Sequence, residues 1–219
     1  MDQIGVIGRC EYLETAALLG QALSVSAQVS LLLLRLRREV RQWQALATAG
    51  ASDSKEARLA EGRVTWLVFL VGSAVGGRVA FSTSEEQAAA DGALISKVLQ
   101  LLRLYDERLS SSGGSEQLQL AAIYFLAQFR KIYISDQVQK TSKVYAKLEE
   151  ELGLSDEAAV LGVFVRKVVG NLKYWPGNEK LVEETLALLN DLSCGFTSAR
   201  KLVALPEVEF LLRNRSGSL

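Results

Sequence analysis

The sequence contains no histidine and only two cysteines, Cys10 and Cys194. Histidine is the commonest general base and metal ligand in proteins, so Ser/His/Asp and Cys/His catalytic arrangements cannot form from this chain. The cysteines lie far apart without CxxC spacing, which argues against a zinc site or a redox pair. We therefore predict a protein that is not an enzyme and carries no cofactor and no metal. Both cysteines are expected to be buried free thiols.

Proline and net charge are also scarce. Only Pro176 and Pro206 interrupt 219 residues, so the chain can sustain long helices. The 25 basic residues are balanced by 25 acidic residues, which gives no overall field to attract nucleic acid or an anionic membrane. The longest apolar stretch, 65–77, is shorter than the ~20 residues that cross a bilayer. We expect it to form a buried helix, with neither nucleic acid nor membrane as a partner.

Apolar residues recur with helical spacing along most of the chain, and no stretch alternates with the period of a strand. The pattern is clearest in 115–133, 155–174 and 178–193. It predicts buried side chains at Phe125, Phe129, Phe164, Val168 and Leu189. In the last stretch, the predicted apolar face consists of Val182, Leu186, Leu189 and Leu192.

Capping residues precede several of these stretches, as Ser84, Ser115, Ser155 and Asn178 do. The predicted helices are 9–47 (with a break near 24–26), 55–77, 85–109, 115–133, 137–151, 156–174, 179–193 and 197–213. Each pair with its turns occupies about 40 residues, the period of HEAT-type repeats. The broad apolar stripes favour stacking on neighbours over a compact bundle. We therefore predict an all-α, HEAT-type α-solenoid of about four antiparallel helix pairs, with 1–219 forming one segment of a longer solenoid.

One cluster of basic residues is a candidate binding site. Its members straddle the turn between two predicted helices and are Arg130, Lys131, Lys140, Lys143 and Lys147. If they converge on one rim, they could bind an acidic protein partner. The alternative is an ordinary solvated helix surface, which is what most charge runs represent.

Several long, irregular strings carry a resemblance to a known family. They are GRCEY at 8–12, GRVTWLVFLVGSAVGGRVAFSTSEEQAAADG at 62–92, QFRKIYISDQVQKTSKVY at 128–145, NLKYW at 171–175 and TLALLNDLSCGFTSARKLVAL at 185–205. In this order they resemble the exportin-7 family of the importin-β superfamily. The resemblance covers most of the chain and is weakest in 22–61.

The resemblance implies a nucleocytoplasmic transport receptor built from HEAT repeats. Such receptors bind protein cargo together with RanGTP, pass nucleoporins in the nuclear pore complex, and shuttle between nucleus and cytoplasm. They have no catalytic activity of their own. Their principal Ran-binding repeats lie near the N-terminus of a much longer chain, outside the matched region. The alternative is a helical-repeat scaffold or adaptor unrelated to transport. As an isolated fragment, the chain is expected to self-associate.

Overall fold

The computed structural model describes residues 25–50, 54–78, 84–112, 114–134, 143–194 and 196–213, and it contains helices but no strand within these ranges. This confirms the all-α prediction. The helices are α2 (Val25–Thr48), α3 (Lys55–Gly76), α4 (Glu85–Ser112), α5 (Glu116–Tyr133), α6 (Lys143–Leu152), α7 (Glu157–Tyr174), α8 (Glu179–Ser193), α9 (Phe196–Val203) and α10 (Pro206–Arg213).

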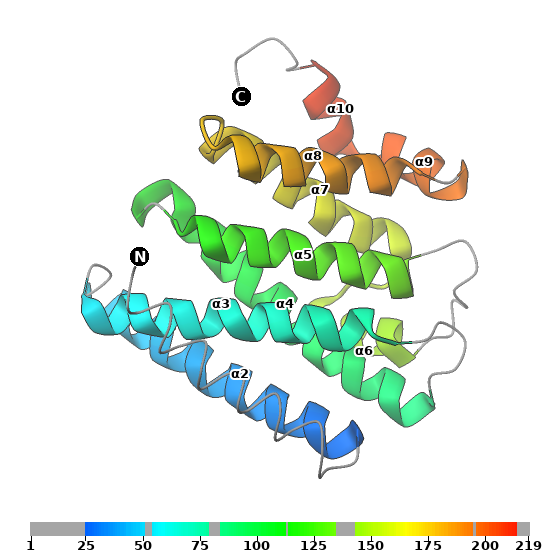
Figure 1. The fold of residues 1–219 in the computed structure, drawn as a ribbon. Helices are drawn as coiled ribbons and strands as arrows, with labels where there is room; N and C mark the ends of the chain where they lie inside the picture. The colour runs from blue at the N-terminus through cyan, green and yellow to red at the C-terminus, as the bar shows by residue number, and fades with distance from the viewer. Residues whose placement is uncertain are drawn as a thin grey trace.

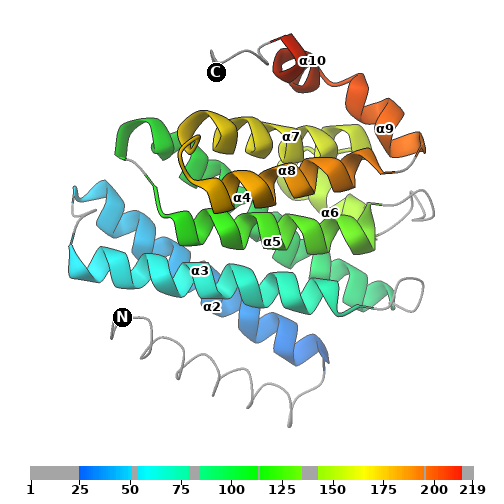
Figure 2. The ribbon, with the colours of Figure 1, turned by 45° about the horizontal axis from the view of Figure 1, so that its top comes forward.

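The helices form two layers that extend in one direction. Helices α3, α5 and α8 lie side by side and run the same way, with α3 packed on α5 and α5 packed on α8 (Figure 1). Behind them α2, α4 and α7 run in the opposite direction, and α6 packs on α4 (Figure 2). The first described helix, α2, and the last, α10, lie at opposite ends (Figure 1). The fold is therefore an open stack of helices, as the solenoid prediction required.

The repeat length differs from the prediction. The equivalent helices α3, α5 and α8 begin at Lys55, Glu116 and Glu179, about 60 residues apart rather than about 40. Two features lengthen the repeat: α4 alone has 28 residues, and the short helix α6 is inserted between α5 and α7. Periodicity in the sequence locates helices, but it does not show which of them occupy equivalent places in a stack.

Some predicted helix boundaries also need correction. The starts of the predicted helices 137–151 and 9–47 are untested, because 135–142 and the residues before Val25 lie outside the described residues. The predicted helix 197–213 is divided into α9 and α10, and α10 starts at Pro206. Proline has no backbone N–H and clashes with the preceding turn inside a helix, but it is well suited to the first helical position.

Side-chain caps fix the start of the three front-layer helices, α3, α5 and α8, and of α7 in the rear layer. The Ser54 hydroxyl accepts a hydrogen bond from the Ala57 N–H at the start of α3, and Asn178 accepts one from the Leu181 N–H at the start of α8. Ser115 caps α5 in the same way, as predicted. For α7, the cap is Asp156 and not the neighbouring Ser155. Each of these side chains satisfies an N–H group that has no partner within its own helix.

Aromatic rings join the two layers at the centre of the core. Phe129 of α5 lies 6.2 Å from Phe125 and 5.7 Å from Phe164 of α7, measured between ring centroids. All three side chains are fully buried, as is Val168. These four burial predictions are confirmed.

The predicted apolar face of α8 is confirmed at Leu192 and is otherwise displaced by one residue. The side chains that face the core are Leu181, Thr185, Leu188 and Leu192. Leu186 is 47% exposed, and Leu189 is only half-buried. The cause is Thr185, whose hydroxyl accepts a hydrogen bond of 3.0 Å from the Asn171 side chain of α7. A pattern search for apolar residues cannot assign a threonine to the core, because it does not see the partner that satisfies the hydroxyl.

Two further expectations concern Cys194 and α3. Cys194 is an exposed free thiol at the C-terminal cap of α8, so its predicted burial is wrong, and Cys10 lies outside the described residues. The cap is extended backbone at the surface, where a side chain has no core to enter. Among the described helices, α3 is long and apolar enough to cross a membrane, judged by length and composition alone. It packs against α2 and α5, as expected of a buried helix in the core.

Candidate partner-binding surfaces

The structure places the predicted basic cluster at the adjoining ends of α5 and α6. Arg130 and Lys131 lie in the last turn of α5, and Lys143 and Lys147 lie on α6. The Tyr145 hydroxyl of α6 donates a hydrogen bond to the Tyr133 carbonyl of α5, which holds the two ends together. Lys140 lies outside the described residues.

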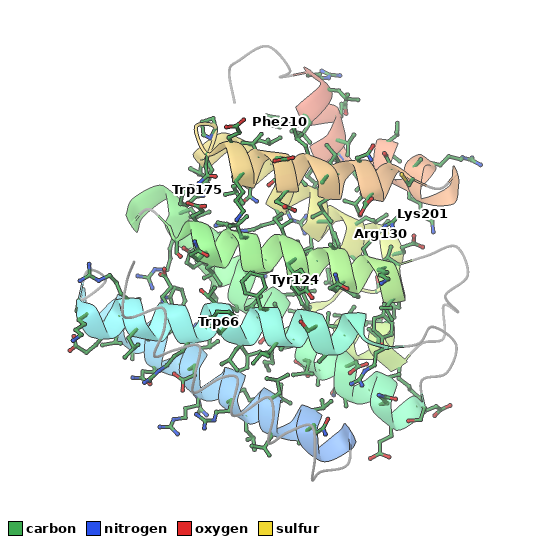
Figure 3. All side chains as sticks on the ribbon, in the orientation of Figure 1. Trp66, Tyr124, Arg130, Trp175, Lys201 and Phe210 are labelled. Carbon is green, nitrogen blue, oxygen red and sulfur yellow. The ribbon has the colours of Figure 1, made fainter. Side chains whose placement is uncertain are left out.

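The charged groups of this cluster are directed at separate partners. The Arg130 guanidinium donates to the Cys194 carbonyl at 3.1 Å (Figure 3 shows Arg130 at the end of α5). Lys143 Nζ lies 3.8 Å from Glu85 of α4. Lys147 Nζ lies 2.6 Å from Glu150, and this hydrogen bond raises the pKa of Lys147. Three of the predicted residues therefore already have acceptors within the chain, which reduces the positive field they offer to a partner.

A second surface, which the sequence did not reveal, is a groove of about 350 Å³ over α5, between α3 and α8. We call it the α5 groove. Its lining residues are Phe69, Gln117, Leu120, Ile123, Tyr124, Ala127, Lys180, Glu184, Ala187, Leu188 and Asp191. Helix α5 supplies the floor, because it lies between α3 and α8 in the front layer (Figure 1).

The wall on the α3 side is aromatic. Phe69 lies 6.0 Å from Trp66 and 5.4 Å from Tyr124, measured between ring centroids. Trp66 and Tyr124 are both seen on the front layer in Figure 3. The Tyr124 hydroxyl is 3.1 Å from the Ser73 hydroxyl. Gly72 makes this contact possible, since a Cβ there would lie 3.0 Å from the Tyr124 ring and 3.1 Å from the Phe125 Cα.

The wall on the α8 side is charged. Helix α8 contains Glu179, Glu183, Glu184 and Asp191 against the single cation Lys180. Lys180 and Gln117 lie at the end of the groove where α5 and α8 begin, and Asp191 and Ala127 lie toward the other end, because the two helices run in parallel. The groove thus combines an aromatic wall, an apolar floor and a mainly acidic rim.

The described residues contain no group of three or more side chains that could hold a metal ion. Inside the described part of the protein, the buried Lys167 is paired with Asp106. Asp106 and Lys167 come from α4 and α7, in the rear layer, and neither lines the α5 groove.

Comparison with known proteins decides the family. A family model described as "Exportin-7-like, TPR domain" matches residues 1–218. The chain belongs to the exportin-7 family. It is 48% identical over 217 residues to Exportin-7-B of Xenopus laevis, a match that covers 99% of this chain and 19% of the relative. It is 40% identical to Ran-binding protein 17 of Mus musculus and 38% identical to Ran-binding protein 16 of Drosophila melanogaster, again over 99% of the chain.

The exportin-7 relatives are much longer than this chain, which spans about a fifth of their length. The family description names TPR rather than HEAT repeats. Both are stacked helix pairs, with periods of about 34 and about 40–47 residues. The spacing of about 60 residues between α3, α5 and α8 exceeds both. No solved structure matches the chain.

Proposed function

We propose that this chain is a segment of a nuclear transport receptor whose full-length form binds protein cargo together with RanGTP and carries it through the nuclear pore. The observation that carries the proposal is the 48% identity to Exportin-7-B over 99% of the chain. The names Ran-binding protein 17 and Ran-binding protein 16 support Ran as a partner of the longer protein. Shuttling between nucleus and cytoplasm and contact with nucleoporins follow from the same proposal.

Within this proposal the segment binds protein partners and connects the adjoining repeats of the full-length receptor, without catalysis. Its relatives bear names of transport and binding proteins. The sequence has no histidine for acid–base work. The open stack of helices presents long side surfaces, which suit protein partners. A scaffold or adaptor unrelated to transport would share this stack, but family membership disfavours that alternative.

The test is a pull-down with Ran locked in the GTP form and with Ran loaded with GDP. The full-length receptor should retain RanGTP and release RanGDP. The isolated chain should bind RanGTP weakly or not at all, because the resemblance places the principal Ran-binding repeats outside it. A full-length receptor that binds neither form, or both forms equally, contradicts the transport proposal.

The basic cluster remains a proposed contact for an acidic protein partner. Its members are Arg130, Lys131, Lys140, Lys143 and Lys147. Because Lys143 and Lys147 already face Glu85 and Glu150, we expect the contact to be weak and screened by salt. Charge reversal at Lys140 and Lys143 should weaken it further. Binding of an acidic partner that is tight and insensitive to salt contradicts this assignment.

A further inference from the structure

We propose that the α5 groove binds a protein segment that carries arginine or lysine next to an apolar side chain. The inference rests on the proposed role of the chain as part of a protein-binding receptor, and it assigns that role a place and a chemistry. Peptide-binding grooves combine apolar anchoring with a few charged contacts that fix specificity, and the α5 groove offers both.

The apolar part of the recognition comes from α3 and α5. Phe69 and Tyr124 are half-buried, and both line the groove, so part of each ring is accessible there. Leu120 and Ala127 are half-buried along the floor. An aliphatic or aromatic side chain laid on this floor would remove apolar surface from water on both partners, which favours association.

The charge of the groove is set by α8. The residues of α3 and α5 that line it are all uncharged. The charged residues of α8 that line the groove are the two carboxylates Glu184 and Asp191 and the ammonium group of Lys180. The rim is therefore negative overall, and it complements a basic segment and repels an acidic one.

The two carboxylates that line the groove are available. Glu184 and Asp191 are exposed, and within the described part of the chain neither side chain forms an ion pair. By contrast, Glu157, Glu207 and Asp106 are each paired with a cation.

An arginine fits this combination better than any other side chain. Its guanidinium stacks on the face of an aromatic ring and binds a carboxylate through two parallel hydrogen bonds. Tyr124 provides the ring, and Glu184 or Asp191 provides the carboxylate. The basic side chain of the bound segment is repelled by Lys180 at one end of the groove. It is also repelled by Arg130, which lies beyond the other end and donates to the Cys194 carbonyl. Both groups therefore favour the middle of the groove for a basic side chain.

Stacking of further repeats would leave the groove open. It lies on the side of the stack, over the middle of three parallel helices, whereas neighbouring repeats add at the ends. An occupant must therefore approach from outside the stack, as a separate partner segment does.

The test is a selection of short random peptides, displayed on phage, on the immobilised chain. We expect enrichment of arginine or lysine next to a large apolar residue. Selected peptides are then synthesised, and their dissociation constants are measured by fluorescence anisotropy. The Glu184→Gln/Asp191→Asn variant should weaken them by about fivefold or more, as expected for the loss of charge-assisted contacts.

The matched control is Glu183→Gln/Glu149→Gln. It removes the same two charges from exposed positions on α8 and α6 that do not line the groove, so binding should change less than about twofold. Replacing arginine in the peptide by neutral citrulline should weaken binding to the wild-type chain but hardly to the groove variant. Circular dichroism of each variant shows whether it is folded.

Selection of acidic or purely apolar peptides overturns the proposal, and so does equal binding to the groove variant. Failure to select any peptide contradicts it too, because an open basic-peptide site should retain at least weak ligands from a random library. A groove occupied by a second copy of the chain, seen as self-association that Glu184→Gln/Asp191→Asn abolishes, is a further contradicting result. These measurements do not involve Ran, so they stand or fail separately from the transport proposal.

Discussion

Lys167 of α7 and Asp106 of α4 form an ion pair with 2.6 Å between Nζ and Oδ1. The Lys167 side chain is only 3% exposed, whereas Asp106 is 35% exposed. Burial lowers the pKa of Lys167, and the charge and hydrogen bond of Asp106 oppose this shift. The pair therefore carries a buried cation whose neutralising partner stands at the edge of the interior, and it joins two helices of the rear layer.

Removing the partner should cost more than removing the cation. Asp106→Asn leaves the Lys167 ammonium buried without its counter-charge and should destabilise the fold by about 2–4 kcal/mol, somewhat below a fully buried pair because Asp106 is partly solvated. Lys167→Met replaces the cation by an apolar chain of similar length and should change stability by less than about 1 kcal/mol. Urea unfolding of both variants measures the difference. A greater loss for Lys167→Met contradicts this account.

The pH dependence of stability follows from the same pair. Burial lowers the pKa of Lys167 below its ordinary value of 10.5. At pH values between the folded-state and the unfolded-state pKa, the unfolded chain therefore binds more protons than the folded chain. Stability should therefore rise as the pH increases toward about 10. Above this range, burial raises the pKa of Tyr105 and Tyr145, so the unfolded chain loses their protons first and stability should fall. Lys167→Met should abolish the rise while it preserves the fall, which thermal unfolding across this range can show.

The fold was predictable because it depends on signals that a sequence displays directly. Helices and their buried faces can be located from the helical spacing of apolar residues, as around Phe125 and Phe129 on α5 and around Phe164 on α7. The cap at Ser115 locates a helix start. The α5 groove was not predictable, because Phe69, Tyr124 and Glu184 meet only through the packing of three helices distant in the chain. The basic cluster shows the same limit, since Arg130 finds its partner at Cys194.

The face of α8 offers a direct check on the corrected helix phase. Leu188 is 2% exposed and Leu186 is 47% exposed, although both are leucines on the same helix. Leu188→Ala should cost about 2–5 kcal/mol through lost burial and a cavity, whereas Leu186→Ala should cost less than about 1 kcal/mol. Denaturant unfolding of the two variants compares them. Equal losses of stability for the two variants would contradict the assignment of Leu188, and not Leu186, to the buried face of α8.

The contact between α3 and α5 depends on a glycine without a side chain. A Cβ at Gly72 would meet the Tyr124 ring at 3.0 Å and the Phe125 backbone at 3.1 Å, so Gly72→Ala should destabilise the fold by about 1–3 kcal/mol. Gly62 lies on the same helix with nothing within 4 Å of such a Cβ. Gly62→Ala should stabilise by about 0.5–1 kcal/mol, since alanine is the better helix former. Melting temperatures that move in the same direction for both variants would refute the close approach.

The C-terminal end of the stack exposes large apolar side chains. They are Leu186 on α8, Val203 on α9, and Phe210 and Leu212 on α10, with Leu212 64% exposed. Leu205 and Leu211, close to them in the chain, are half-buried. A helix inside a solenoid normally has its outer edge covered by the next repeat, and terminal repeats are more polar.

We therefore expect the isolated chain to self-associate through this end, because exposed apolar patches favour association. Light scattering coupled to size exclusion should show a mass that rises with protein concentration. The double variant Phe210→Ser/Leu212→Ser should shift the chain toward the monomer. The control Leu104→Ser changes an exposed leucine of α4, away from this end, and should leave the mass unchanged. Because apolar contacts are not screened by salt, raising the ionic strength should not dissociate the assembly. A monodisperse monomer at every concentration would contradict the predicted self-association. Equal effects of the double variant and the control would place the contact elsewhere.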